Sequence, residues 1–166
     1  MRQSMLSINR LLPIKVIFLL SLIVFSCSST KSELEKIELV QLDGARINWA
    51  DYKNKVVFIN FWATWCKPCI QEMPTIAKAK QQLNEQDVAF LFPSNESTDL
   101  IQNFKEKKGF DFDFVQVQNM EDLNIIALPT TYIFNQRGEL VFSEAGFRDW
   151  STPENMALIT GNSDKP

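Results

Sequence analysis

The chain has 166 residues, of which 45% are hydrophobic, including thirteen Phe and four Trp, and this suffices for one domain with a substantial core. There are 17 basic and 20 acidic residues, an acidic balance that disfavours nucleic acid as a partner. The sequence has no histidine, which excludes Ser-His and Cys-His catalysis and imidazole metal sites, so we expect no metal and no separate cofactor.

The first 26 residues have the pattern of an export signal. Basic residues come first, and the uncharged apolar run from Val16 to Phe25 follows. A membrane-spanning helix needs about 20 apolar residues, so this run is too short to span a bilayer. Residues 22–27 resemble the lipobox of bacterial lipoproteins, because an aliphatic residue and a small one precede Cys27. We expect a lipoprotein signal peptide over 1–26 and lipidation of Cys27; the alternative is an ordinary cleaved signal and an unmodified Cys27.

The segment 27–36 is polar and charged, as is typical of a tether between a lipid anchor and a domain. We therefore expect a domain over residues 37–161 and a short tail over 162–166. Acyl chains would hold this domain at a membrane surface, facing the periplasm.

The first half of the domain combines a hairpin with a strand and a helix. Asp43-Gly44 is a tight-turn signal between strand-like stretches at 37–42 and 46–49. The nearly continuous apolar run at 55–62 suits a central strand that is covered on both faces. A helical pattern from 68 to about 83 follows, and it contains an internal proline that should kink it.

The second half alternates strands and helices and ends in an antiparallel pair and a last helix. The expected elements are a strand at 88–92, a helix from Ser97 or Thr98 to Gly109, strands at 112–117, 130–134 and 139–143, and a helix from Pro153 to Gly161. This order predicts an α/β fold: a central mixed β-sheet flanked by helices on both faces, with an N-terminal β-hairpin.

The strongest motif is Cys66-Lys67-Pro68-Cys69, where a buried strand gives way to a helix. The free N–H groups at a helix start stabilise a thiolate, and in such motifs the pKa of the first thiol falls from about 8.5 to about 7 or below. Lys67 adds positive charge, and Pro68 suits a first helical turn. Cys69, three residues after Cys66, lies on the same face and within bonding reach.

These properties predict dithiol–disulfide exchange, in which Cys66 attacks a partner disulfide and Cys69 resolves the mixed disulfide. Two other interpretations exist. A purely structural disulfide is disfavoured, because we expect a motif at a helix start to be more exposed than a disulfide that only stabilises the fold. A zinc site is disfavoured because two further ligands are missing.

The sequence also resembles the TlpA/ResA branch of the thioredoxin superfamily. The resemblance rests on residues 56–69 with the Glu-Met-Pro that begins at Glu72, and it extends to Asp43-Gly44 and to 128–134 with Gly138. It implies a thioredoxin-like fold and a membrane-anchored reductant of extracytoplasmic protein thiols, including those of cytochrome c maturation. Such a protein would take its electrons from an upstream membrane donor.

The resemblance also implies roles for single residues. Pro129 matches the cis-proline that lies beside the cysteines and lets the adjoining backbone pair with a substrate; the alternative is an ordinary trans proline. Leu128 would line the same groove. Glu72 matches an acidic residue that could accept the proton of Cys69 one helical turn away; the alternative is a solvated surface glutamate.

Aromatic and polar neighbours complete the expected site. Trp62 and Trp65 would pack around the disulfide and offer an apolar contact surface, although core or rim packing is equally consistent. We expect Trp65, Lys67 and Pro68 to contact the substrate together with Leu128 and Pro129. Asn60 stands where thioredoxins have a titratable Asp, so the proton transfer falls to Glu72 or to water.

We therefore predict a monomeric, lipid-anchored reductase of protein disulfides. One alternative is an oxidase or isomerase on the same fold, because Lys67 favours the thiolate and hence the oxidising direction. A non-catalytic copper-delivery module is disfavoured by the lack of histidine. A peroxiredoxin-type peroxidase would need Thr three residues before a lone cysteine, whereas Thr64 lies two residues before Cys66.

Overall fold

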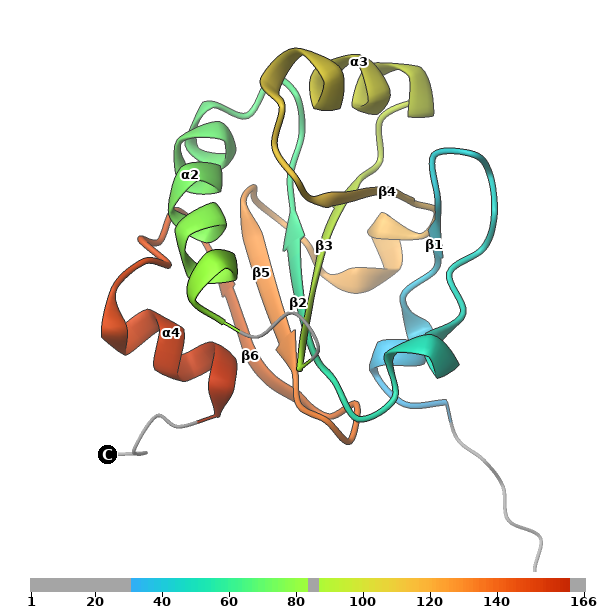
Figure 1. Cartoon of the computed structure of the whole chain (residues 1–166). Helices are drawn as coiled ribbons and strands as arrows, with labels where there is room; N and C mark the ends of the chain where they lie inside the picture. Colours follow the sequence, from blue (N-terminus) through green and yellow to red (C-terminus); the bar gives the residue numbers. More distant parts are fainter. Residues whose placement is uncertain (1–30, 84–86, 162–166) are drawn as a thin grey trace, which may run out of the picture. The chain divides into compact units, whose positions relative to one another are not determined.

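A computed structural model of the chain describes residues 31–83 and 87–161 (Figure 1). The expected signal peptide, the expected lipidation at Cys27, residues 27–30 of the expected tether and the expected tail lie outside these residues. Within them, residues Leu34–Lys36 form the short 3-10 turn η2, and Leu34 is buried. The packed structure therefore includes the last residues of the expected tether.

A mixed six-stranded sheet forms the centre of the domain and confirms the predicted fold class. The strand order is β1-β4-β3-β2-β5-β6; β3 pairs in parallel with β2 and β4, and the remaining pairs are antiparallel. The bounds are Leu39–Val40 for β1, Val56–Phe61 for β2, Val88–Ser94 for β3, Asp113–Val117 for β4, Thr130–Phe134 for β5 and Leu140–Ala145 for β6.

The predicted helices form close to the expected bounds. They are α2 over Lys67–Gln82, α3 over Thr98–Lys108 and α4 over Pro153–Thr160. Gly109 ends α3 with a φ of 67°, a conformation that favours glycine. None of the helices in the described part of the chain is long and apolar enough to cross a membrane.

The two faces of the sheet are covered differently. Side chains of α2, α3 and α4 pack in one cluster with Phe58 and Trp62. The other cluster contains Val57, Ile59 and Phe61, and it is covered by η2 and by the 3-10 turns η3 (Trp49–Tyr52) and η4 (Met120–Leu123). Helices therefore cover both faces, as predicted, but those on the second face are short 3-10 helices, and residues 118–126 contribute only η4.

The N-terminal hairpin is shorter than predicted. Its first arm is the two-residue strand β1, and the returning arm touches it through a single bridge between Val40 and Arg46. The predicted turn is present, since Gly44 has a φ of 89° and its N–H donates to the carbonyl of Gln41. The return ends early because the Asn48 side chain accepts the N–H of Ala50 and starts η3.

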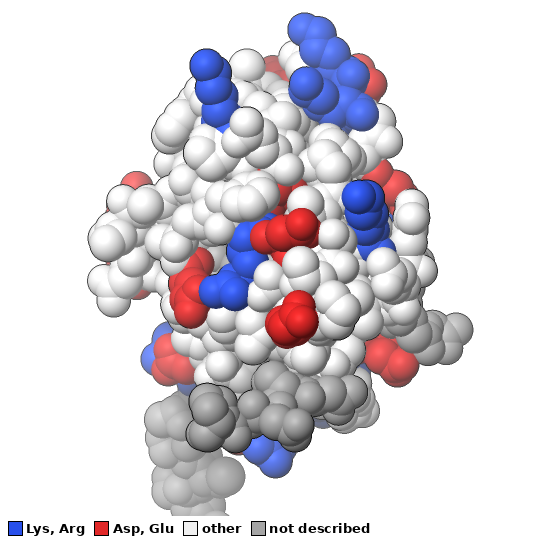
Figure 2. Space-filling view, turned by 90° about the vertical axis from the view of Figure 1, so that its left-hand side faces the viewer, with Lys and Arg blue, Asp and Glu red and all other residues white. Residues whose placement is uncertain are grey.

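Figure 2 shows the side of the domain on which α2 and α4 lie. Acidic and basic side chains are interspersed there among a larger area of uncharged ones. The described residues on this face therefore form no extended block of one charge.

Candidate active site

Cys66 and Cys69 form a disulfide at the first turn of α2, with their Cα atoms 5.3 Å apart. Cys66 is the N-cap residue, and its Sγ accepts the N–H of Cys69 at 3.3 Å. Pro68 lies in the first turn, where a missing N–H costs nothing. The sulfur of Cys66 is thus held at the positive end of the helix, as the sequence predicted.

Both cysteines are almost fully covered. Cys66 is 3% exposed and Cys69 is 0% exposed, whereas Lys67 and Pro68 between them are exposed. Our expectation that the motif is too exposed for a structural disulfide is therefore wrong, because both cysteines pack against the core beneath the helix. Burial alone does not separate a structural from a reactive disulfide, and the surrounding groups must do so.

A carboxylate fixes the loop that leads into the cysteines. Glu96, just after β3, accepts the N–H of Thr64 at 2.7 Å with one oxygen and the Thr64 hydroxyl at 2.6 Å with the other. The Ser94 hydroxyl donates to the same carboxylate at 3.1 Å. Glu96 carries no recognisable sequence signal, because only the parallel pairing of β2 and β3 brings it beside a residue 32 positions away.

The two tryptophans near the motif have different surroundings. Trp62 is fully buried, donates its Nε1 hydrogen to the carbonyl of Phe92 at 3.0 Å, and packs on Phe104 at 4.5 Å between ring centroids. Trp65 is 71% exposed. Trp62 is therefore a core residue, and Trp65 is the one available to a partner.

Glu72 lies one turn after Cys69 and is completely buried, so the alternative of a solvated surface glutamate is wrong. One carboxylate oxygen accepts the N–H of Arg148 at 3.0 Å and the indole N–H of Trp150 at 2.7 Å. The other accepts an amide hydrogen of Asn60 at 3.0 Å. Burial raises the pKa of Glu72 above its ordinary value, and the hydrogen bonds from Trp150 and Asn60 oppose this rise. Such a carboxyl group is suited to taking up and releasing a proton.

Trp150 and Arg148 are functional neighbours of Glu72 that the sequence alone does not reveal. The guanidinium of Arg148 lies 5.3 Å from the ring centre of Phe142 and 5.8 Å from that of Trp150, donates to Asn155 at 2.7 Å and forms a salt bridge with Glu144. These contacts hold the loop before α4 against Glu72. A tryptophan 78 positions from the glutamate gives no recognisable sequence signal.

The Leu128–Pro129 peptide bond is cis, as the family resemblance implied, while the substrate contact expected of Pro129 stays a prediction. The carbonyl of Pro129 accepts the N–H of Gly146 at 2.7 Å, and Leu128 is partly buried against both core clusters. Thr131, two residues later, accepts a hydrogen bond of 2.9 Å from Asn60. One segment therefore links the cis-proline to the buried groups around Glu72.

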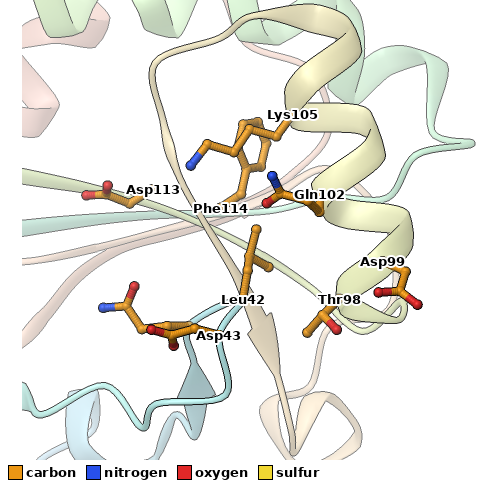
Figure 3. A pocket seen from close by; sticks show the side chains of 9 residues that line it. Leu42, Asp43, Thr98, Asp99, Gln102, Lys105, Asp113 and Phe114 are labelled. Carbon is orange, nitrogen blue, oxygen red and sulfur yellow. The ribbon is translucent and has the colours of Figure 1, made fainter.

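A separate pocket of about 450 Å³ opens elsewhere, between the loop after β1, the start of α3 and β4. Figure 3 shows Leu42, Gln102, Lys105 and Phe114 around it. No predicted site residue lines this pocket. It is therefore not part of the candidate active site.

A CxxC disulfide at the start of a helix, on a sheet of this topology and with a cis-proline in the chain, defines the class of thioredoxin-fold thiol–disulfide oxidoreductases. The comparisons with known proteins agree, since the profile of the AhpC/TSA family matches residues 30–143. The chain belongs to this family and, within it, to the ResA-like thiol–disulfide oxidoreductases.

The similar curated proteins include two named thiol–disulfide oxidoreductase ResA. The Bacillus subtilis protein is 33% identical over 117 residues, which cover 68% of this chain and 65% of that protein. The Halalkalibacterium halodurans protein is 33% identical over 126 residues, covering 73% and 72%. The chain thus spans slightly less than two thirds of the Bacillus subtilis relative.

Solved structures show the same fold. StoA from Bacillus subtilis aligns with a TM-score of 0.56 at 20% identity, covering 68% of this chain and 88% of that one. A thiol:disulfide interchange protein of the thioredoxin family from Chlorobium tepidum aligns with a TM-score of 0.59 at 24% identity, covering 73% and 92%.

Proposed function

We propose that this protein reduces disulfides in other proteins by dithiol–disulfide exchange at Cys66 and Cys69. The observation that carries the proposal is the position of Cys66 as the N-cap of α2, with its sulfur accepting a backbone N–H. In the reduced protein, the same N–H groups and the helix dipole stabilise a thiolate, and the thiolate is the form that attacks disulfides.

The reaction has two exchanges. The Cys66 thiolate attacks one sulfur of the partner disulfide, so that a mixed disulfide forms and the other partner sulfur leaves as a thiolate. The Cys69 thiolate then attacks Sγ of Cys66, so that the Cys66–Cys69 bond forms and the second partner sulfur leaves. Two electrons pass from the cysteine pair to the partner, and the pair is left in the disulfide form that the structure contains.

Cys69 must lose a proton before the second exchange. Glu72 lies one turn further along α2, and the pKa rise caused by burial makes its carboxylate a better proton acceptor than an ordinary glutamate. We assign to Glu72 the role of accepting this proton. An external dithiol donor, which we expect to be membrane-bound, then reduces the pair again.

The proposed location is the periplasmic side of a membrane, with a lipid anchor at Cys27. The apolar run of ten residues that leads into and overlaps the lipobox-like sequence supports it. The exposed Trp65 and Lys67 beside the cysteines, with Pro68, Leu128 and Pro129, are the proposed substrate contacts. Thiols of cytochrome c maturation are one substrate group that the family resemblance suggests, and we expect a monomer.

The activity is tested by reduction of insulin disulfides with dithiothreitol as electron donor. We expect rapid turnover by the protein and none by the Cys66→Ser variant. The Cys69→Ser variant should instead accumulate mixed disulfides with partner proteins in intact cells. Absence of turnover in the unmodified protein would contradict the proposal.

The direction of exchange needs its own measurement. Equilibration of the cysteine pair with glutathione gives its reduction potential, and roughly 30 mV corresponds to about 1.4 kcal/mol for this two-electron couple. A potential near that of thioredoxin supports a reductase. A potential near that of the strong oxidants would favour the oxidase alternative while leaving disulfide exchange intact.

A further inference from the structure

Asn60 is a fully buried amide beneath the active-site helix. It lies on β2 directly opposite Thr131 of β5, and its side chain is on the same face of the sheet as Phe58 and Trp62. Its Nδ2 donates to Oε2 of Glu72 at 3.0 Å and to Oγ1 of Thr131 at 2.9 Å. Its Oδ1, although buried, has no hydrogen-bond partner among the described residues.

This arrangement fits one protonation state of Glu72. A carboxylate only accepts hydrogen bonds, and all three hydrogen bonds to the Glu72 side chain come from N–H donors: Asn60, Arg148 and Trp150. With Nδ2 turned toward Glu72 and Thr131, the better acceptor of the amide faces away and is left unpaired. An unpaired buried acceptor is costly, so the ionised carboxylate is what holds the amide in this orientation.

The same arrangement does not fit the neutral acid. A proton on Oε2 of Glu72 would meet the N–H of Asn60, which places two donors face to face. A half-turn of the amide about its last side-chain bond removes the conflict with Glu72, and it exchanges the unpaired Oδ1 of the present orientation for an unpaired Nδ2. Oδ1 then accepts the Oε2–H of Glu72 and the hydroxyl hydrogen of Thr131, because these two oxygens already flank the amide nitrogen.

We propose that Asn60 and Thr131 are positioning residues for the proton transfer, and that the Asn60 amide reverses its orientation each time Glu72 takes up the proton of Cys69. The inference rests on the proposed role of Glu72 in disulfide exchange. The S–H bond of Cys69 breaks, an O–H bond forms on Oε2, and the sulfur keeps the electron pair as a thiolate. The reversed amide accepts the new O–H and holds the proton until it leaves for solvent.

The groups that face Glu72 come from four segments. Arg148, from the loop before α4, is the charged group that acts on it and lowers its pKa. Cys69 lies one turn earlier on the same helix and is titratable once the disulfide is reduced, while β2 and β5 contribute the neutral Asn60 and Thr131. Among the described residues on the sheet side, the Asn60 amide is the group hydrogen-bonded to Glu72 itself, and an amide can both donate to a carboxylate and accept from an acid.

The test is an NMR titration of the reduced, isotope-labelled protein. The carboxyl carbon of Glu72 and the side-chain amide of Asn60 should titrate with one midpoint. Nuclear Overhauser contacts between the amide hydrogens and Thr131 should be present above the midpoint and lost below it. Contacts that persist through the Glu72 titration would overturn the inference, since a merely structural amide does not turn.

Two variants sharpen the result. In Glu72→Gln, the new amide nitrogen can only donate, so the Asn60 signals should match the low-pH form at every pH and cease to titrate. In Asn60→Asp, a second carboxyl group replaces the amide, and the proton affinity of Glu72 should rise at least tenfold, which is one pH unit. Thr130→Val is the control, because the Thr130 hydroxyl bonds Ala127 instead, and it should leave the Glu72 midpoint unchanged.

The titration separates this inference from the proposed function. Coupled titration in a protein that does not reduce insulin would support the reversal and contradict the activity. Insulin reduction with an amide that never turns would support the activity and contradict the reversal.

Discussion

The indole of Trp150 donates a 2.7 Å hydrogen bond to Oε1 of Glu72, and both side chains are buried. This bond joins the loop before α4 to the second turn of the active-site helix. The ring also packs edge-on against Phe58 at 4.8 Å between centroids. Glu72 is thus solvated by fixed protein donors instead of water, and its ionised form depends on each of them.

Trp150→Phe removes this donor while keeping an aromatic ring in the core. We expect a loss of about 1.5–3 kcal/mol in the free energy of unfolding at pH values where Glu72 is ionised, since the bond is to a charged group. The loss should be smaller where Glu72 is protonated, and the pKa of Glu72 should rise. Urea unfolding at several pH values and the carboxyl NMR signal measure both effects.

Trp49→Phe is the matched control for this variant. The Trp49 indole donates to the neutral carbonyl of Ile37 at 3.1 Å in a half-buried position. Its loss should cost about 0.5–1.5 kcal/mol and should not vary with pH. Equal pH dependence in the two variants would contradict the role given to the Trp150 bond.

Glu72→Gln should change how stability depends on pH. Because the folded pKa of Glu72 is raised, the native protein binds this proton more tightly than the unfolded chain. Its stabilising effect is complete below the unfolded pKa and is lost as the pH rises through the folded pKa. The unfolding free energy of the variant relative to the original protein should therefore increase from acidic to neutral pH, as measured by urea unfolding.

Glu139→Gln provides the opposite sign. The hydrogen bond from Arg137 lowers the pKa of the exposed Glu139, so its contribution is present above the unfolded pKa and is lost as the pH falls. The relative stability of this variant should decrease toward neutral pH. If the relative unfolding free energies of the two variants change with pH in the same direction, Glu72 does not titrate as its burial implies.

The sequence predicted the fold and the cysteine pair because both depend on local patterns. The apolar run of β2, the glycine at the end of α3 and the spacing of Cys66 and Cys69 each act within a few residues. The cis bond at Pro129 came from the family resemblance, since an X-Pro bond is cis in only about 5–6% of folded cases.

The surroundings of the cysteines could not be predicted in this way. Glu96, Arg148 and Trp150 reach the site from loops after distant strands, and their sequence positions carry no periodic or motif signal. The burial of Cys66 was also missed, because a helix start is usually solvated and only the packing beneath α2 covers it.

The thiol of Cys66 in the reduced protein should be more acidic than free cysteine. We expect its alkylation by iodoacetamide to rise with a midpoint at about pH 7 or below, against about 8.5 for an ordinary thiol. The measurement is made on the Cys69→Ser variant, so that Cys66 alone reacts within the motif. A midpoint at the ordinary value would remove the physical basis of the proposed exchange.

Glu96→Ala should loosen the loop before Cys66. The variant loses the acceptors of the Thr64 N–H and hydroxyl, and we expect about 1–2 kcal/mol of destabilisation for these partly buried bonds. Amide hydrogen exchange at Thr64 should accelerate more than exchange elsewhere in the domain. Glu96→Gln keeps one acceptor oxygen and should show a smaller effect; identical behaviour of the two variants would contradict the role of the paired bonds.

Trp65→Ala should weaken reactions with protein substrates without weakening the fold. Trp65 is 71% exposed beside Cys66, so its removal should change the unfolding free energy by no more than about 0.5 kcal/mol. If the indole forms part of the partner contact, kcat/KM for insulin falls several-fold, whereas the rate with oxidised glutathione, which is too small to cover the indole, stays close to that of the original protein. Phe147→Ala serves as the control, since Phe147 is 53% exposed but lies outside the predicted substrate contacts. If Trp65→Ala lowers the rates with insulin and with oxidised glutathione by the same factor, the indole affects the reactivity of Cys66 and does not contribute to partner binding.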